Sequence, residues 1–122
     1  MHNLLKIFLL LALLAVGFGA CRRDPDLTGI PEVSYNNDIK RIMSGNCAFS
    51  GCHDGGGGEA GGLVTYEEVM GHVKAGEARK SELYRIVTGR SFTKMPPSGY
   101  PDVSKEDIRL IYLWIEQGAK NN

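Results

Sequence analysis

Two of the three cysteines in this chain lie close together, in the segment CAFSGCH from Cys47 to His53. The histidine follows the second of these cysteines, Cys52, without a gap. Three kinds of chemistry use such side chains: a disulfide, a zinc site, or a haem held by two thioether bonds with the histidine on the iron. Only the haem hypothesis gives all three residues a role in one mechanism.

The two alternatives each leave something unexplained. A disulfide between Cys47 and Cys52 would close a very small loop, so it would stabilise the fold little by loop entropy. It would also give His53 no role. A structural zinc ion takes four ligands, so His72 or a carboxylate would have to complete the set. The adjacent residues Cys52 and His53 are moreover an awkward pair of ligands for one ion.

The N-terminal segment predicts where this chemistry takes place. Lys6 precedes an apolar run over residues 7–16, and small residues follow. That order is typical of a secretory signal peptide. The run is short for a membrane-spanning helix, which needs about 20 apolar residues. We therefore expect residues 1–20 to be a signal peptide. An ordinary signal peptide without lipidation, or an uncleaved anchor, would leave Cys21 without a role.

The signal ends in Gly19, Ala20 and Cys21, and here it resembles the signal of bacterial lipoproteins. The resemblance implies cleavage before Cys21 and acylation of that cysteine. Residues 21–33 contain two prolines and no periodicity, and we interpret them as a lipidated tether. The protein is then expected outside the cytoplasm, on the periplasmic side or at the cell surface, with a lipid anchor in a bacterial membrane.

Composition makes nucleic acid an unfavourable partner and indicates a small hydrophobic core. The chain has 122 residues, and its 14 basic and 14 acidic side chains balance. Such a balance does not favour nucleic acid as a partner, because nucleic-acid binding asks for a clustered basic face. Residues 34–122 are long enough for one small domain. With 16 glycines in the chain and few large apolar residues, that domain needs a staple or a cofactor to complete its core.

The elements around the cysteines follow a helical pattern. Ile39, Ile42 and Met43 have helical spacing and predict a helix that starts near Ser34 and leads directly to Cys47. A glycine-rich loop follows His53. Further helices are expected after Thr65, whose partner in a capping box is Glu68, and after Ser81, which we expect to cap the helix ending at Gly89.

The strongest helical pattern lies at the C-terminal end, after an irregular segment with three prolines. Ser104 is expected to cap this helix and Gly118 to end it. No alternation typical of a strand persists anywhere. The predicted fold class is all-α, with about four helices and long loops.

The segment Cys47–His53 resembles the attachment motif of the c-type cytochromes. That motif usually has two residues between the cysteines, whereas this one has four, including Gly51. A straight helix would turn residues five apart to different faces, so Gly51 is expected to form a bulge that returns Cys52 to the face of Cys47. The order of elements from residue 34 to residue 122 is also similar to that of small single-haem cytochromes c.

The resemblance implies a cytochrome c-like domain over residues 34–122, built around one covalent haem c. Cys47 and Cys52 would form the thioether bonds and His53 would bind the iron. Met95 is the expected sixth ligand, because it lies in an irregular loop between the motif and the last helix and precedes two prolines. His72 is the rival for that position.

The expected function is electron transfer between redox partner proteins, with no catalytic residues. Two protein ligands on the iron would leave no position for a substrate. Two alternatives from other classes stay open. One is a haem-based ligand-binding or sensing module with a labile sixth ligand, and the other is a cofactor-free interaction domain stabilised by a disulfide.

Overall fold

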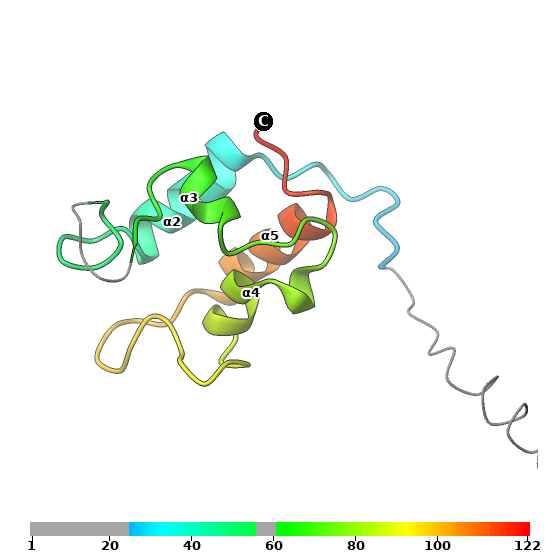
Figure 1. Ribbon diagram of the computed structural model, residues 1–122. Helices are drawn as coiled ribbons and strands as arrows, with labels where there is room; N and C mark the ends of the chain where they lie inside the picture. The colour runs from blue at the N-terminus through cyan, green and yellow to red at the C-terminus, as the bar shows by residue number, and fades with distance from the viewer. Residues whose placement is uncertain (1–24, 56–60) are drawn as a thin grey trace, which may run out of the picture.

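The computed structural model describes residues 25–55 and 61–122, and within these ranges it is helical without strands (Figure 1). The elements are η1 (Tyr35–Ile39), α2 (Lys40–Asn46), α3 (Tyr66–Met70), η2 (Ala78–Lys80), α4 (Glu82–Val87) and α5 (Lys105–Glu116). The predicted all-α class is confirmed. Within the described ranges, no helix has both the length and the apolar character needed to cross a membrane.

The first helix consists of a π-helical start, η1, that runs directly into α2. Ser34 caps it: its hydroxyl accepts a hydrogen bond from the N–H of Asn37 at 3.2 Å. The Asp38 carboxylate in turn accepts from the N–H of Ser34 at 2.9 Å. The helix continues past Gly45 to Asn46, whose side-chain amide donates to the carbonyl of Ile42 at 3.0 Å. It therefore ends immediately before Cys47.

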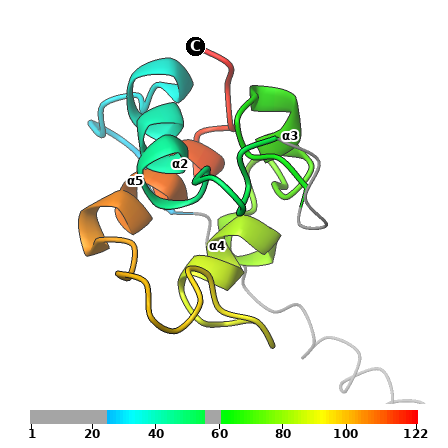
Figure 2. The same cartoon turned by 90° about the vertical axis from the view of Figure 1, so that its left-hand side faces the viewer.

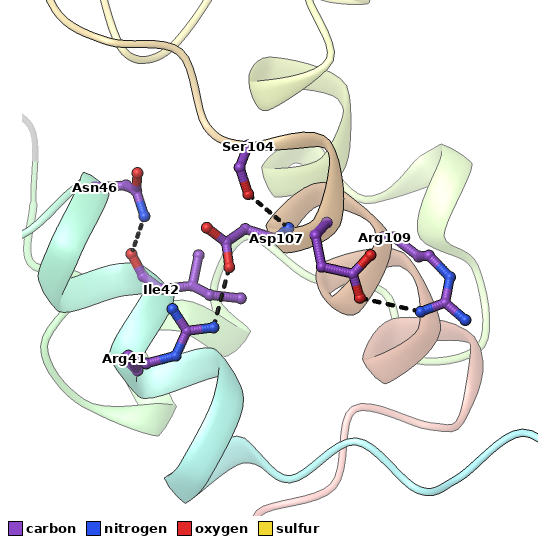
Figure 3. A network of polar contacts seen from close by, with 7 residues as sticks. Arg41, Ile42, Asn46, Ser104, Asp107 and Arg109 are labelled. Atoms are coloured by element: carbon purple, nitrogen blue, oxygen red, sulfur yellow. Dashed lines mark hydrogen bonds and ion pairs between the residues drawn. The ribbon is translucent and has the colours of Figure 1, made fainter.

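Helix α5 lies beside the first helix and forms the main core with it (Figure 2). The Ser104 hydroxyl accepts from the N–H of Asp107 at 3.0 Å, which confirms the predicted cap. An ion pair between Arg41 of α2 and Asp107, at 3.0 Å, links the two helices at the surface (Figure 3). The buried core residues of these helices include Ile39, Ile42, Met43, Ile111, Trp114 and Ile115.

The chain after α5 returns to the start of the first helix (Figure 1). Asn122 accepts two backbone hydrogen bonds there, from Tyr35 to its side-chain oxygen at 2.9 Å and from Asn36 to its carbonyl at 3.0 Å. On the same side, Gln117 bonds the backbone of Val33 at 2.9 Å and that of Pro31 at 2.9 Å. The segment just before the first helix is thus held against α5.

The shorter helices cover the rest of the core, and the predicted N-cap residues of α3 and α4 are both in place, but only that of α3 makes a side-chain capping bond. Thr65 and Glu68 form the capping box that begins α3. Ser81 precedes α4, but its side chain does not cap that helix. The Ser81 hydroxyl is buried and instead accepts from the N–H of Lys74 at 2.8 Å and donates to nearby carbonyls of the same turn. The hydroxyl bonds to this turn instead of to α4, because the backbone groups of the turn need hydrogen-bond partners.

Candidate functional site

An open cavity of about 420 Å³ lies between the segment after α2, helix α4 and the segment that precedes α5. In Figure 1 the two connecting segments extend from the same side of the helices. The walls are mainly apolar. They include Phe49, Leu63, Leu83, Ile86, Val87 and Tyr100. A cavity of this size and character is typical of a site for an organic cofactor or ligand.

Cys47 and Cys52 both line this cavity, and both are free thiols. Cys47 is the C-cap residue of α2, where its N–H still donates to the carbonyl of Met43 at 2.9 Å. The chain then turns back, with the N–H of Cys52 bonded to the carbonyl of Phe49 at 2.9 Å. Gly51 has φ +81°, which a glycine adopts without strain. This is the expected bulge, and it brings both thiols to one cavity.

Burial raises the pKa of the Cys47 thiol to about 11. The thiol is therefore protonated near neutral pH. In the part of the chain that the structure describes, no three His, Cys, Asp or Glu side chains come together closely enough to hold one metal ion. Cys47, Cys52 and His53 all line the cavity.

The surroundings of His53 determine which of its two ring nitrogens carries the proton. Nδ1 lies 2.9 Å from the carbonyl oxygen of Gly61, which can only accept a hydrogen bond. Nδ1 must therefore carry the proton, and the lone pair is on Nε2. The backbone of His53 is held as well, because its carbonyl accepts from Leu63 at 3.0 Å and its N–H donates to Cys47 at 3.3 Å. Metal-binding histidines in proteins commonly have this partner on the second nitrogen.

His72 also lines the cavity, from the turn that follows α3. Its Nδ1 lies 2.9 Å from the Glu82 carboxylate at the start of α4, so its Nε2 is likewise the free nitrogen. The His72 side chain is 39% exposed and that of Glu82 is 59% exposed, so the pair belongs to the rim of the cavity. The structure therefore brings both candidates for the sixth ligand, His72 and Met95, to the same cavity.

Met95 is held at the cavity by its backbone. Its N–H donates to the carbonyl of Ile86, one of the wall residues of α4, at 3.3 Å. Pro96 and Pro97 follow and line the cavity too, and the Met95–Pro96 peptide bond is cis. An ion pair joins the two ends of this segment, with Nζ of Lys94 2.7 Å from Oδ1 of Asp102. The other predicted site residue, Cys21, lies outside the described residues.

Sequence reasoning missed three contributors to this site. The Gly61 carbonyl is a backbone group inside a glycine-rich loop, so no side chain signals its role. Glu82 was part of a helix start, and only the fold places it beside His72. The apolar face of α4 also lines the cavity wall, with Leu83, Ile86 and Val87, which its helical pattern alone does not show. An apolar face followed by a Met-Pro-Pro segment is the signal that could have indicated it.

No protein-family model, curated protein or solved structure matches this chain. Its function must therefore be argued from the cavity itself, which offers two thiols, two histidines with free Nε2 atoms and one thioether around apolar walls.

Proposed function

We propose that the cavity holds one covalent haem c, and that the protein is an electron carrier with a cytochrome c-like domain over residues 34–122. One observation carries this proposal. Cys47, Cys52, His53 and Met95, which come from two separate segments of the chain, line the same apolar cavity. The second segment is far from the first in sequence, so only the fold brings the thioether of Met95 to the two thiols and the imidazole.

The residues present fit such a group. The apolar walls suit the faces of a porphyrin, and the exposed aromatic side chains Phe49 and Tyr100 would gain cover from it. Each thiol would add across one vinyl group, with its sulfur bonding to one carbon and its hydrogen passing to the other. This addition consumes no oxidant.

His53 would bind the iron through Nε2, while Gly61 keeps the proton on Nδ1. Met95 would supply a second ligand from a segment that two prolines stiffen. A haem held in this way supplies one-electron exchange between the ferric and ferrous states of its iron. If His53 and Met95 both bind the iron, no site for a substrate would remain there, so the protein would not be an enzyme under this proposal.

The proposed setting is the outer side of a bacterial membrane. Cys21 would carry the lipid, and acyl chains there would hold the domain at the membrane surface near its redox partner proteins. Labelled palmitate should then enter the wild-type protein and not Cys21→Ser. Equal labelling of both would rule out this anchor.

The deciding experiment is expression of the full chain in a host with and without the machinery that attaches haem c. We expect a red protein whose haem survives denaturation and acid–acetone extraction, and whose intact mass includes one haem. Cys47→Ala should leave a single thioether bond and a poorly matured protein. His53→Ala should lose most of the haem. A protein without haem from the competent host would overturn the proposal.

The sixth ligand has its own test, because His72 lines the cavity as well. Met95→Ala should abolish the weak far-red absorption band of methionine-bound ferric haem and open the iron to cyanide or carbon monoxide. His72→Ala, the matched variant, should leave the band in place. If the two results are exchanged, His72 is the ligand, and the expected reduction potential is lower because methionine ligation raises it.

A further inference from the structure

The carboxylate of Glu68 holds a stretch of backbone outside its own helix. Its Oε2 accepts hydrogen bonds from the N–H groups of Val64 at 2.9 Å and Thr65 at 2.8 Å. The Thr65 hydroxyl accepts from the N–H of Glu68 at 3.2 Å. A capping box consists of the two bonds with Thr65. The bond from Val64 is additional, and it extends the hold of Glu68 towards Leu63, which lines the cavity.

Gly62 lies so close to this carboxylate that a side chain there would force the carboxylate to move. A Cβ atom at Gly62 would stand 2.2 Å from Oε1 of Glu68 and 2.6 Å from its Cδ. Gly55, at the other end of the glycine-rich loop, is also near, since a Cβ atom there would stand 4.0 Å from Oε1. The described ends of the loop therefore both lie beside Glu68, and glycine at position 62 is what lets the carboxylate pack against the backbone.

The same stretch of backbone holds His53. The Gly61 carbonyl accepts from Nδ1 of the ring at 2.9 Å, and the N–H of Leu63 donates to the His53 carbonyl at 3.0 Å. Residues 61 and 63 thus bind the histidine, while Glu68 packs on residue 62 and binds residues 64 and 65. The two sets of contacts alternate along one short segment, so a shift in one moves the other.

The Glu68 carboxylate stays charged, and so stays a strong hydrogen-bond acceptor, near neutral pH. The hydrogen bonds from the N–H groups of Thr65 and Val64 lower the pKa of Glu68, so it is ionised near neutral pH. Glu67, the preceding residue of α3, is exposed and provides a control with the same charge on the same helix.

We propose that Glu68 is a positioning residue for His53: by holding residues 62–65 it keeps the Gly61 carbonyl on Nδ1 and so keeps the lone pair on Nε2. The consequence for the iron ligand rests on the function proposed above. The consequence for the tautomer of His53 does not, because it depends only on contacts within the chain.

The first test uses the full chain with its haem. Solvent exchange of the His53 Nδ1 proton, followed by NMR in the ferrous state, should be about two- to tenfold faster in Glu68→Ala, the range expected for losing one hydrogen bond. Gly62→Ala should have the same effect by displacing the carboxylate, and Glu68→Gln, which keeps an acceptor oxygen, should restore most of the protection. Glu67→Ala should match the wild type. Unchanged exchange in Glu68→Ala, with a lower unfolding free energy, would show that Glu68 is only a helix cap.

The second test separates failure of this inference from failure of the proposed function. In the haem-free full chain, the nitrogen chemical shifts of His53 at about pH 8, where an imidazole is neutral, should show the Nδ1–H tautomer. Glu68→Ala should give a mixture of the two tautomers. If the purified protein never carries haem and yet shows this change, the electron-carrier proposal fails and the positioning role stands. A wild-type protein that already has mixed tautomers would overturn the positioning role.

Discussion

The helical frame and the cavity region of this domain differ in how completely the protein packs itself. In the frame, formed by the first helix and α5, the large side chains Ile39, Ile111 and Ile115 are fully buried. In the segments around the cavity, aromatic side chains are left in solvent, with Phe49 44% and Tyr100 53% exposed. All the exposed large hydrophobic residues in the described ranges lie in these loop segments; they are Phe49, Val64, Phe92 and Tyr100.

The difference indicates that the protein alone buries the apolar side chains of the frame, whereas it leaves apolar side chains around the cavity in contact with solvent. Apolar side chains cost free energy in water, so a small domain with walls of this kind gains most when something apolar covers them. Under our proposal the haem completes the second region. Stability measurements on haem-free and haem-loaded protein can therefore distinguish the two regions.

The largest expected effect comes from a matched pair of isoleucine truncations. Ile111→Ala in the frame should lower the unfolding free energy by about 2–5 kcal/mol, with or without haem, because it opens a cavity in a packed core. Ile86→Ala, in the wall of α4, should cost about 1 kcal/mol or less without haem and clearly more with it. Urea unfolding of both forms measures this. An equal loss of unfolding free energy for Ile86→Ala in haem-free and haem-loaded protein would contradict the proposed difference between the frame and the cavity region.

The next prediction concerns Cys47, where the frame meets the cavity. Because burial raises its pKa from 9.0 to about 11, alkylation of Cys47 near pH 8 should be about a hundredfold slower in the folded haem-free protein than in denaturant. The folded pKa lies above the unfolded one, so the associated stability is present below about pH 9 and is lost as the pH rises towards 11. Mass spectrometry of the alkylated peptides gives the rates, and equal rates in both states would contradict the burial.

The frame was the more predictable region from sequence. Helix starts at Thr65 and Ser104 followed from side chains that satisfy backbone N–H groups within the next turn, which is a local effect. Ser81 is the N-cap residue of α4 as predicted, but its buried hydroxyl bonds to the preceding turn instead of to the helix, which the sequence does not show. The contact of Asn122 with the first helix was not predicted, since it joins the two ends of the domain and leaves no local pattern.

The candidate site was predictable in its residue types and not in its supporting contacts. Cys47, Cys52 and His53 were predicted from spacing and chemistry, and Met95 from the resemblance to c-type cytochromes and its irregular loop. The structure places all four at one cavity, and their role in holding a cofactor stays a prediction. The Gly61 carbonyl that orients His53 has no side-chain signature. The approach of Glu68 to Gly62 depends on loop geometry that a capping pattern does not contain.

A smaller effect is expected where the end of the chain joins the frame. Asn122→Ala removes the acceptor for the N–H of Tyr35 and should cost about 0.5–1.5 kcal/mol of unfolding free energy. The cost stays moderate because the Asn122 carbonyl still accepts from Asn36. Asn121→Ala, at an exposed position, is the control and should be neutral. Similar costs for the two variants would mean that this side-chain contact contributes nothing.

The smallest expected change is at a hydroxyl group inside the frame. The Tyr35 ring is buried and packs edge-on against Tyr66, with centroids 5.0 Å apart. Its hydroxyl is buried too, and within the described part of the chain it has no hydrogen-bond partner. Burial also raises the pKa of Tyr35, so the group is neutral near pH 7.

Tyr35→Phe should therefore be neutral or stabilise the protein by up to about 1 kcal/mol, because it keeps the ring contacts and removes an unpaired polar group. The matched variant Tyr66→Phe should have the opposite sign and cost about 0.5–1.5 kcal/mol, since the Tyr66 hydroxyl donates to the Ala119 carbonyl at 2.8 Å. Urea unfolding of both variants in haem-free protein compares them directly. If Tyr35→Phe costs as much as Tyr66→Phe, the Tyr35 hydroxyl has a partner in solution, and the frame is less completely packed by apolar contacts than its burial indicates.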